Sequence, residues 1–409
     1  MTVISKMDHS DFFLMSSLLS PRENATRKRV REFVDTRLLP IINEYWERAE
    51  FPEELIPDLR ELGIAGTNIT GYGCPGMSSL ELGITAMELS RGDGSINTFL
   101  AVQSGLAMGS ISRLGSDEQK QRWLPRMAAL DLIGAFALTE PNHGSDSVAL
   151  ETTAERRGSH YVLNGQKRWI GNGSMADIVV IWARDTVDGG VKAFVFEREA
   201  GQPYPVGYQP TVITGKIGKR AILQADIVID ELEIPAENLL AHSRDFKDAV
   251  SVLNATRSSA SWEALGHAVA AFEIAQDYAQ ERSQFGSTIG SYQLVQNLLA
   301  NMLGEVTAMY TMCVRAAQLA EEGQLTGPMS SLLKLHTAKK GRWVCQSSRD
   351  ILAGNGLLLE HHVARHMTDM EIVHTYEGTE FIQSLLVGRE LTGVSAFSAS
   401  KKNREQVQE

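Results

Sequence analysis

The segment Tyr376-Glu-Gly-Thr379 places a carboxylate between an aromatic ring and a glycine, immediately before a helix-like run of residues. A carboxylate held among apolar groups has a raised pKa and can accept a proton in a reaction. The same residues also fit a structural account, in which Thr379 is the N-cap of the following helix. From these residues alone, Glu377 is a candidate base.

Three further segments combine polar groups with aromatic rings or glycines. Thr139-Glu-Pro-Asn-His-Gly-Ser-Asp146 has the composition of a loop whose backbone N–H groups can face an anion or a ring edge. Trp169-Ile-Gly-Asn172 places a large flat ring beside a glycine. Arg282-Ser-Gln-Phe-Gly286 ends a long helical pattern with a cation, an aromatic and a stop signal. Taken singly, each segment is more simply a loop, a strand end or a helix C-cap.

The sequence lacks the motifs of metal sites, serine hydrolases and dinucleotide-binding folds. His361, His362 and His366 include an i, i+4 pair, but no His-Glu-x-x-His sequence and no Cys/His cluster accompanies them. We therefore expect ordinary surface or interface histidines and no metal site. The chain has no Gly-x-Ser-x-Gly motif, and no Gly-x-Gly-x-x-Gly follows a predicted strand. This argues against a serine hydrolase and against a classical dinucleotide-binding fold.

The composition narrows the class of protein. The 409 residues carry a net charge of −11 at pH 7, which is a poor electrostatic match for nucleic acid or an anionic membrane surface. A basic cluster at Arg27–Arg31 lies in a helical pattern and is interpreted as a solvated face. The cysteines at 74, 313 and 345 are far apart, as in a reducing compartment. We expect a cytoplasmic protein with no nucleic-acid or membrane partner.

The hydrophobic pattern changes period twice along the chain. Apolar residues at three-to-four spacing predict a helical domain over residues 1–131. Short β-branched runs predict an antiparallel β-domain over 132–244, with Asn164-Gly165 as the turn of a hairpin. The helical period returns over 245–409, where four helices are predicted to form a four-helix bundle, at 249–282, 292–322, 328–352 and 381–392. The predicted fold class is α+β.

Taken together, in this order and at these separations, the motifs resemble those of the acyl-CoA dehydrogenase family. The resemblance extends from about Ser20 to Phe397. It rests on five motifs, namely Thr139-Glu-Pro-x-x-Gly-Ser-Asp146, Asn164-Gly-x-Lys-x-Trp-Ile170, Arg282-x-x-Phe-Gly286, Gly354-Asn-Gly356 and Tyr376-Glu-Gly-Thr379. Within the family, the chain looks most similar to the branch of glutaryl-CoA dehydrogenases and plant short-chain acyl-CoA oxidases. The resemblance implies a helical domain, a β-domain and a four-helix bundle, with FAD as cofactor and usually a homotetramer.

The resemblance also implies which residues contact the flavin. Trp169 and Ile170 would cover one flavin face, with Gly171 beside them, and Thr379 and Phe397 would contact FAD from the C-terminal part. Further flavin contacts would come from Phe136, Leu138, Thr139, Gly144 and Ser145, the last also near the CoA moiety. The FAD of a neighbouring subunit would be reached by Arg282, Phe285, Gln293, Asp350, Ile351, Leu352, Ala353 and Gly354.

Glu377 occupies the position of the family's usual catalytic base. There it would remove the α-proton of a thioester while a β-hydride passes to flavin N5. Its backbone N–H, with a flavin hydroxyl, would polarise the thioester carbonyl. Some relatives carry the base on an earlier helix, but the matching segment Leu253-Asn-Ala-Thr-Arg257 has no carboxylate. Asn254, Arg257 and Gly378 would lie in the substrate site.

Two positions depart from the family's patterns. Glutaryl-CoA dehydrogenases hold the distal carboxylate of their substrate with an arginine, and the matching position here is Asn97. An unpaired second carboxylate would be costly to desolvate, which argues against glutaryl-CoA as substrate. Many dehydrogenases have a threonine where this chain has Gly171, and the short-chain oxidases share that glycine.

The sequence therefore predicts an FAD-dependent dehydrogenase acting on a short, uncharged acyl-CoA thioester, with an electron-transfer flavoprotein as acceptor. Three alternatives stay open at this point. They are a short-chain acyl-CoA oxidase that uses O₂, a dehydrogenase of a carrier-protein-bound acyl group in biosynthesis, and a non-catalytic flavin-binding scaffold.

Overall fold

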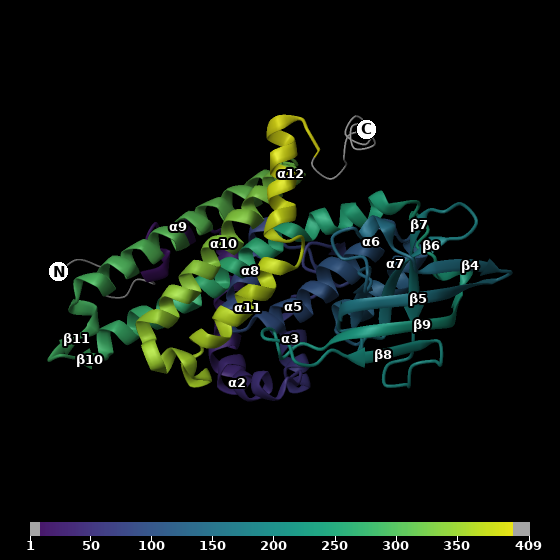
Figure 1. The fold of residues 1–409 in the computed structure, drawn as a ribbon. Coiled ribbons are helices and arrows are strands. Elements are labelled where there is room, and N and C mark those ends of the chain that lie inside the picture. Colours follow the sequence, from purple (N-terminus) through teal and green to yellow (C-terminus); the bar gives the residue numbers. More distant parts are fainter. Residues whose placement is uncertain (1–8, 396–409) are drawn as a thin grey trace, which may run out of the picture.

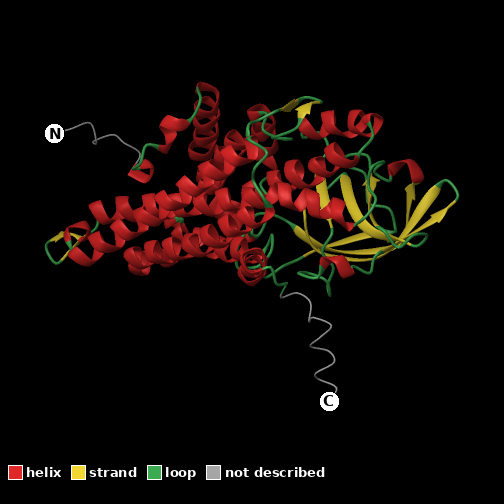
Figure 2. Ribbon diagram, turned by 90° about the horizontal axis from the view of Figure 1, so that it is seen from above, coloured by secondary structure: helices red, strands yellow, loops and turns green. Residues whose placement is uncertain are grey.

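The computed structural model describes residues 9–395. The helical bundle lies toward one end of the long axis of the molecule and the sheet toward the other (Figures 1 and 2). Helix α8 (Phe246–Glu281) extends from the bundle to the sheet. The order along the chain is a set of helices, a β-domain and a second set of helices, as the change of period predicts. None of the helices between residues 9 and 395 combines the length and apolar character that crossing a bilayer requires.

The N-terminal helices have start and stop signals in their own sequence. Ser20 begins α1 with a capping box, because its hydroxyl accepts from the Glu23 N–H and its own N–H donates to the Glu23 carboxylate. Gly63 ends α3 with a φ of 63°. The elements of this part are α1 (Pro21–Phe33), η4 (Val34–Leu38), α2 (Leu39–Arg48), α3 (Ile56–Leu62), α4 (Ser79–Gly92), α5 (Gly94–Ala101), η6 (Val102–Met108), α6 (Gly109–Leu114) and α7 (Asp117–Ala128).

Part of the basic cluster on α1 is not a solvated face. The Nε atoms of Arg27 and Arg31 each lie 2.9 Å from a carboxylate oxygen of Glu88, which is completely buried on α4. A buried carboxylate needs charged partners, and two residues of the cluster supply them. The prediction from charge alone was wrong here because the partner lies 57 or more positions away.

Within residues 9–395, seven strands form one sheet in the order β3-β6-β4-β5-β9-β8, with β7 paired to β6. The pairings of β3 and of β4 with β6 are parallel, so the sheet is mixed rather than antiparallel throughout. The strands are β3 (Gly134–Ala137), β4 (Thr153–Arg157), β5 (His160–Gly171), β6 (Ile178–Asp185), β7 (Val191–Glu197), β8 (Tyr208–Val212) and β9 (Gln224–Pro235). Side chains of η6, α6 and α7 pack with β6 and β7 in one apolar core.

Asn164-Gly165 is not a hairpin turn, which corrects the prediction. Both residues lie inside the continuous strand β5, where the register against β9 shifts between Leu163 and Gly165. A Cβ atom at Gly165 would lie 2.7 Å from Thr152 Cα, and the φ of Gly165 is 154°. The glycine therefore serves a bulge and a close backbone approach, which is its other common use in a strand.

The second set of helices is a bundle around an apolar core to which α4 also contributes. Besides α8 it contains α9 (Gln293–Glu321), α10 (Gly327–Leu352), α11 (Val363–Thr375) and α12 (Glu380–Thr392). Helix α11 is not among the predicted helices, and its inner face carries the buried polar residues Arg365, His366 and Asp369. Helices are predicted from a periodic stripe of apolar residues, and charged residues on the buried face of α11 interrupt that stripe.

The histidine interpretation also needs a correction. His366 is buried, and its Nδ1 lies 2.8 Å from Nδ1 of His267 on α8. Burial lowers the pKa of both rings well below the ordinary value, so the pair is uncharged near neutral pH. His366 is thus an interior helix–helix contact rather than a surface residue.

Candidate active site

The candidate base lies in a short loop between α11 and α12. Glu377 and Gly378 have φ values of 54° and 87°, so two adjacent residues are in the left-handed region. Lys334 Nζ donates to the Gly378 carbonyl at 2.6 Å, and Gln383 Nε2 donates to the Glu377 carbonyl at 2.7 Å. A side chain at Gly378 would clash with the Gln383 amide. The loop is therefore held in a strained conformation that its neighbours determine.

The Glu377 carboxylate combines burial with an unused acceptor. Its Oε2 atom is buried and has no hydrogen-bond partner among residues 9–395. Burial raises the pKa of Glu377, while the cations Arg257 and Lys334 oppose that rise without cancelling it. The Nε of Arg257 is likewise buried and without a partner in that part of the chain. A buried carboxylate oxygen with a raised pKa thus has no hydrogen-bond donor from the described part of the chain.

Lys334 is a site residue that the sequence analysis missed. It lies on α10, its side chain is almost completely buried, and burial lowers its pKa to about 8 despite the attraction of Glu377. A single lysine on a helix is ordinarily a surface residue, so the residue type does not indicate burial. Its helical spacing from Ser330 and Thr337, four and three residues away, places it on the same buried side of α10.

The neighbours of Glu377 in the motif have defined partners. The hydroxyl of Tyr376 donates to Glu263 and accepts from Lys219 Nζ at 3.0 Å. Thr379 is the N-cap of α12, with its hydroxyl accepting from the Ile382 N–H at 3.3 Å. The structural account of Thr379 is confirmed, and its proposed contact with FAD stays a prediction.

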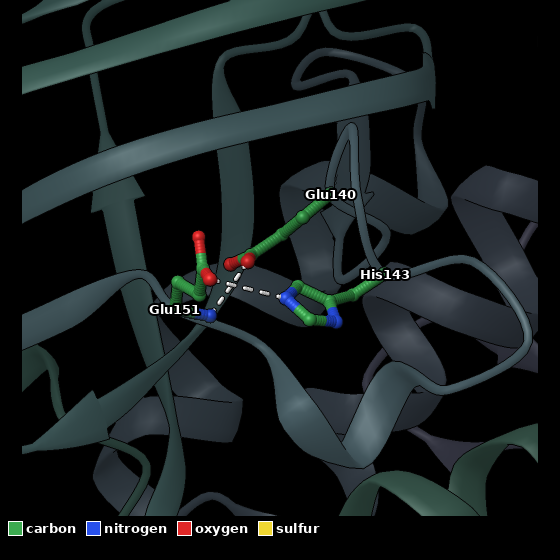
Figure 3. Close-up of side chains that lie close together, drawn as sticks. All are labelled: Glu140, His143 and Glu151. Carbon is green, nitrogen blue, oxygen red and sulfur yellow. Dashed lines mark hydrogen bonds and ion pairs between the residues drawn. The ribbon is translucent and has the colours of Figure 1, made fainter.

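Glu140 lies in the loop after β3, close to His143 and Glu151 (Figure 3). The Glu140 carboxylate accepts from the N–H groups of Glu151 and Thr152 at 2.6 and 2.9 Å, from the Thr152 hydroxyl, and from buried Lys167 at 2.9 Å. His143 and Glu151 approach the same point, with His143 Nε2 3.4 Å from a Glu151 oxygen. Because four donors already occupy Glu140, we interpret the group as a structural anchor for the loop rather than as metal ligands.

The same loop presents its tip to the outside. Gly144 and Ser145 are exposed, and nothing lies within 4 Å of a Cβ atom built at Gly144. Phe136 and Leu138 are buried at its start, and Thr139 is half-buried. The Thr139 carbonyl accepts from the Arg168 N–H at 2.8 Å. This bond joins the loop to the end of β5.

Trp169 lies in an irregular part of β5 that directs its ring outward. The register against β9 shifts between Lys167 and Ile170, and Trp169 has a φ of 63°. The Trp169 side chain is 52% exposed, whereas Ile170 is buried. A large exposed ring beside an open glycine loop is the arrangement expected for a flat cofactor.

Segment η6 lies between these residues and the base. A Cβ atom at Gly171 would lie 3.0 Å from Val102 Cγ2, and one at Gly105 would lie 2.9 Å from Thr256 Cγ2. Thr256 precedes Arg257 on α8, and its hydroxyl is among the groups that lower the pKa of Glu377. The fold therefore brings Gly171 at the strand end and Thr256 beside the base to the same helical segment.

Other residues of the predicted site lie far from this place. Arg282, Phe285 and Gln293 are exposed in and beside the β10–β11 hairpin (Ser283–Gln284 and Ser287–Thr288), at the end of the bundle away from the sheet (Figure 1). The 350–354 stretch is near the same end, because Asn355 donates to the Tyr278 hydroxyl at 3.0 Å.

Within that stretch the side chains differ in exposure. Asp350, Ala353 and Gly354 are exposed, while Ile351 and Leu352 have their side chains in the bundle core. Any ligand contact of the last two must therefore be made by their backbone. On α8, Asn254 is exposed and Arg257 half-buried. Phe397 lies outside the described residues.

Family models match nearly the whole chain. The acyl-CoA dehydrogenase N-terminal domain matches residues 20–131, the middle domain 135–232 and the C-terminal domain 246–392. A short-chain specific acyl-CoA dehydrogenase of Clostridium acetobutylicum is 32% identical over 374 residues, which cover 90% of this chain and 97% of the relative.

Solved structures give the same picture. The glutaryl-CoA dehydrogenase of Mycobacterium smegmatis in complex with FADH2 is 35% identical, with a TM-score of 0.92 over 96% of this chain and 100% of the other. A chain in the structure described as the electron transferring flavoprotein of Acidaminococcus fermentans is 31% identical, with a TM-score of 0.86 over 91% of this chain and 98% of the other.

Proposed function

We propose that this chain, which belongs to the acyl-CoA dehydrogenase family, desaturates a short, uncharged acyl-CoA thioester between its α and β carbons. Membership makes it an FAD-dependent enzyme. The observation that carries the finer proposal is the Glu377 carboxylate, buried with one oxygen unused beside Arg257 and Lys334. In this proposal Glu377 takes the α-proton.

The residues of the β-domain fit an FAD ring system. The exposed Trp169 ring, the open loop at Gly144 and Ser145, and the apolar pair Phe136 and Leu138 offer a stacking face, an exposed backbone and an apolar wall. FAD supplies a hydride acceptor when it is bound. The chain's contribution is to hold that ring beside η6, with Thr139, Ile170 and Gly171 next to it and Thr379 on the side of the base.

Glu377 is suited to remove a proton from carbon. A raised pKa makes the ionised carboxylate a stronger base than an exposed one, which matters because the α-proton of a thioester is weakly acidic. Arg257 and Lys334 keep the ionised form attainable despite burial. The pinned backbone of the loop directs the Glu377 N–H and Gly378 to fixed positions, where the N–H can stabilise negative charge on the thioester oxygen.

The proposal of an uncharged substrate rests on two positions, Asn97 and Arg91, neither of which offers a cation to a distal carboxylate. Asn97 replaces a cation at the far end of the predicted acyl site. Arg91, the nearest cation in sequence, pairs instead with Glu88 at 3.2 Å, with Glu273 at 3.7 Å and with Asp35. A distal carboxylate would therefore enter without an ion partner.

A comparison of butyryl-CoA with glutaryl-CoA tests this choice of substrate. Butyryl-CoA should give a kcat/KM at least about tenfold higher, since a charge-assisted hydrogen bond is worth about 1.5–3 kcal/mol. Efficient formation of crotonyl-CoA and carbon dioxide from glutaryl-CoA would contradict it. Bleaching of the yellow FAD colour by an acyl-CoA separates an enzyme from a flavin-binding scaffold, and a carrier-bound thioester in the same panel tests the biosynthetic alternative.

We also propose an assembly and an acceptor. The exposed hairpin with Arg282 and Phe285 would reach the FAD of a neighbouring copy in a homotetramer. An electron-transfer flavoprotein is proposed as electron acceptor, supported by the similarity to a chain in the structure that is described by that name. The unpaired cysteines at 74, 313 and 345 support a reducing, cytoplasmic setting.

Gly171 favours one second candidate, an oxidase that passes electrons to O₂. A larger residue there would approach Val102, so the glycine leaves less bulk beside the proposed flavin position. One missing side chain rarely opens a site that bound product fills. Rapid mixing of the substrate-reduced enzyme with air decides between the two: stoichiometric peroxide within the turnover time shows an oxidase, and slow reoxidation accelerated by an electron-transfer flavoprotein shows a dehydrogenase.

A further inference from the structure

Two helical segments next to the base run antiparallel with a fixed register. Gly105 on η6 meets Thr256 on α8, and Gly94 at the start of α5 meets His267 further along α8. The two contacts are eleven residues apart along α5 and η6 and also eleven residues apart along α8, so the register between the two segments does not change over this interval. This register places Ala101 opposite Ala260, and Thr98 opposite Glu263.

The seam between these segments is partly exposed along α5 and η6. Ala101 and Gly105 are partly exposed, although most neighbouring residues of α5 and η6 are buried. The two residues that face each other here, Ala101 and Ala260, both have small side chains. From Thr256, beside the base, to Glu263 the helix rises by about 10 Å at 1.5 Å per residue. An acyl chain that starts at Glu377 can therefore extend along the seam toward Thr98 and Glu263.

The far end of the seam is polar and contains a buried ion pair. Lys219, from the segment between β8 and β9, is ion-paired with Glu263 and donates to the Thr98 hydroxyl at 2.8 Å and to the Tyr376 hydroxyl at 3.0 Å. Tyr376 donates to Glu263 in turn. Lys219 and Glu263 are each about 1% exposed. One cation and one carboxylate compensate each other, and the three donors of the ammonium group are all used.

Asn97 adds an unused donor at this end. It lies one helical turn before Ala101, on the same face of α5, and is 3% exposed. Its Nδ2 is buried and has no hydrogen-bond acceptor among residues 9–395. A buried donor without a partner lowers stability, so native proteins seldom keep one without a ligand or function to satisfy it.

We propose that this end of the seam is a subsite for an acyl chain that ends in an uncharged hydrogen-bond acceptor, such as a hydroxyl oxygen, with Asn97 as donor. The inference rests on the proposed function, because it assumes that the acyl chain starts at Glu377. A terminal methyl group would leave Asn97 unsatisfied. A terminal carboxylate would bring a further negative charge close to Glu263, whose partner Lys219 already uses its three donors.

Three thioesters of equal chain length test the subsite with the FAD-loaded enzyme. We expect kcat/KM to be about threefold to tenfold higher for 5-hydroxypentanoyl-CoA than for pentanoyl-CoA, the range for one net hydrogen bond, and lowest for glutaryl-CoA. Asn97→Leu should reverse the preference between the first two. Thr85→Val is the matched control, since it removes a buried hydroxyl of α4 that bonds the Glu81 carbonyl, and it should keep the wild-type ratio.

The outcomes separate this inference from the proposed function. Wild-type enzyme that prefers pentanoyl-CoA, or an Asn97→Leu enzyme with an unchanged ratio, would overturn the subsite while turnover of pentanoyl-CoA upholds the desaturase. Failure of all three thioesters and of butyryl-CoA to reduce the flavin would overturn the proposed function as well. The wild-type ratio alone decides the matter if Asn97→Leu does not fold.

Discussion

The Glu377 carboxylate is buried, which opposes its ionisation, and two neighbouring cations partly offset this effect. Arg257 and Lys334 supply positive charge without a hydrogen bond to Oε2, which stays free for a proton. Buried polar atoms without partners are rare in proteins and call for an explanation. Among residues 9–395, such atoms include Asn97 Nδ2, Arg257 Nε, Glu377 Oε2 and Gln383 Oε1. Substrate is the simplest partner for them.

Replacing Glu377 by glutamine should remove the base and keep the fold. The amide has nearly the same shape but cannot accept the α-proton, so turnover should fall by about 10²–10⁴-fold. Retained FAD absorbance in the purified variant is the control that its site is intact. Near-normal desaturation of butyryl-CoA by Glu377→Gln would move the base elsewhere.

Lys334→Met should shift the pH dependence of the reaction. The Lys334 cation lowers the pKa of Glu377, so its loss should raise that pKa further. The base is active when ionised, and the acid limb of kcat/KM should therefore move to higher pH, with activity lost first at the low end of the range. The shift should be measured against Lys339→Met, a matched change of an exposed lysine on the same helix. An unchanged acid limb in Lys334→Met would contradict this role.

Individual elements show why the sequence predicts some structure and misses the rest. The long helices of the bundle were predicted to within a few residues, because their apolar period is regular. Helix α11 was missed because Arg365 and Asp369 interrupt that period, and both have partners far along the chain, Arg365 with Asp93 and Asp369 with Lys219. The same reason hid Lys334 and the Lys219–Glu263 pair. Motifs located Glu377 and Trp169, but the partners of these residues depend on tertiary contacts.

Gly165 offers a test of one element. Alanine there would place a Cβ atom 2.7 Å from Thr152 Cα in a backbone conformation that favours glycine, so we expect a loss of about 2–4 kcal/mol in the free energy of unfolding. Urea unfolding followed by circular dichroism measures it. Gly304→Ala is the control, because that exposed position of α9 is open and should gain about 0.5–1 kcal/mol. Equal effects of the two changes would show that the bulge does not need glycine.

On the scale of the whole molecule, the predicted flavin contacts fall into two groups at opposite ends. The loop at Gly144 and the Trp169 ring belong to the β-domain, whereas Arg282 and Phe285 are on the hairpin at the far end of the bundle (Figure 1). Phe285 is 96% exposed, which is unusual for a large apolar side chain in a single chain. One chain cannot bring both groups to the same FAD, so a second copy must supply one of them if both predictions hold.

Cofactor retention should therefore follow the oligomeric state. Arg282→Ala removes the cation of the hairpin, and Phe285→Ser removes its exposed ring. Either change should release FAD or weaken the oligomer, because each contact is proposed to cross between copies. Arg48→Ala is a suitable control, since Arg48 is an exposed arginine of α2 whose partners, Glu44 and Glu50, are local. Light scattering gives the mass of each variant, and the absorbance of the bound flavin gives its occupancy.

A hairpin variant that runs as a monomer and still holds FAD at wild-type affinity would show that each chain completes its own cofactor site. Loss of FAD from an intact oligomer would instead locate the effect at the contact itself, which is the outcome expected if Arg282 touches the cofactor of its neighbour.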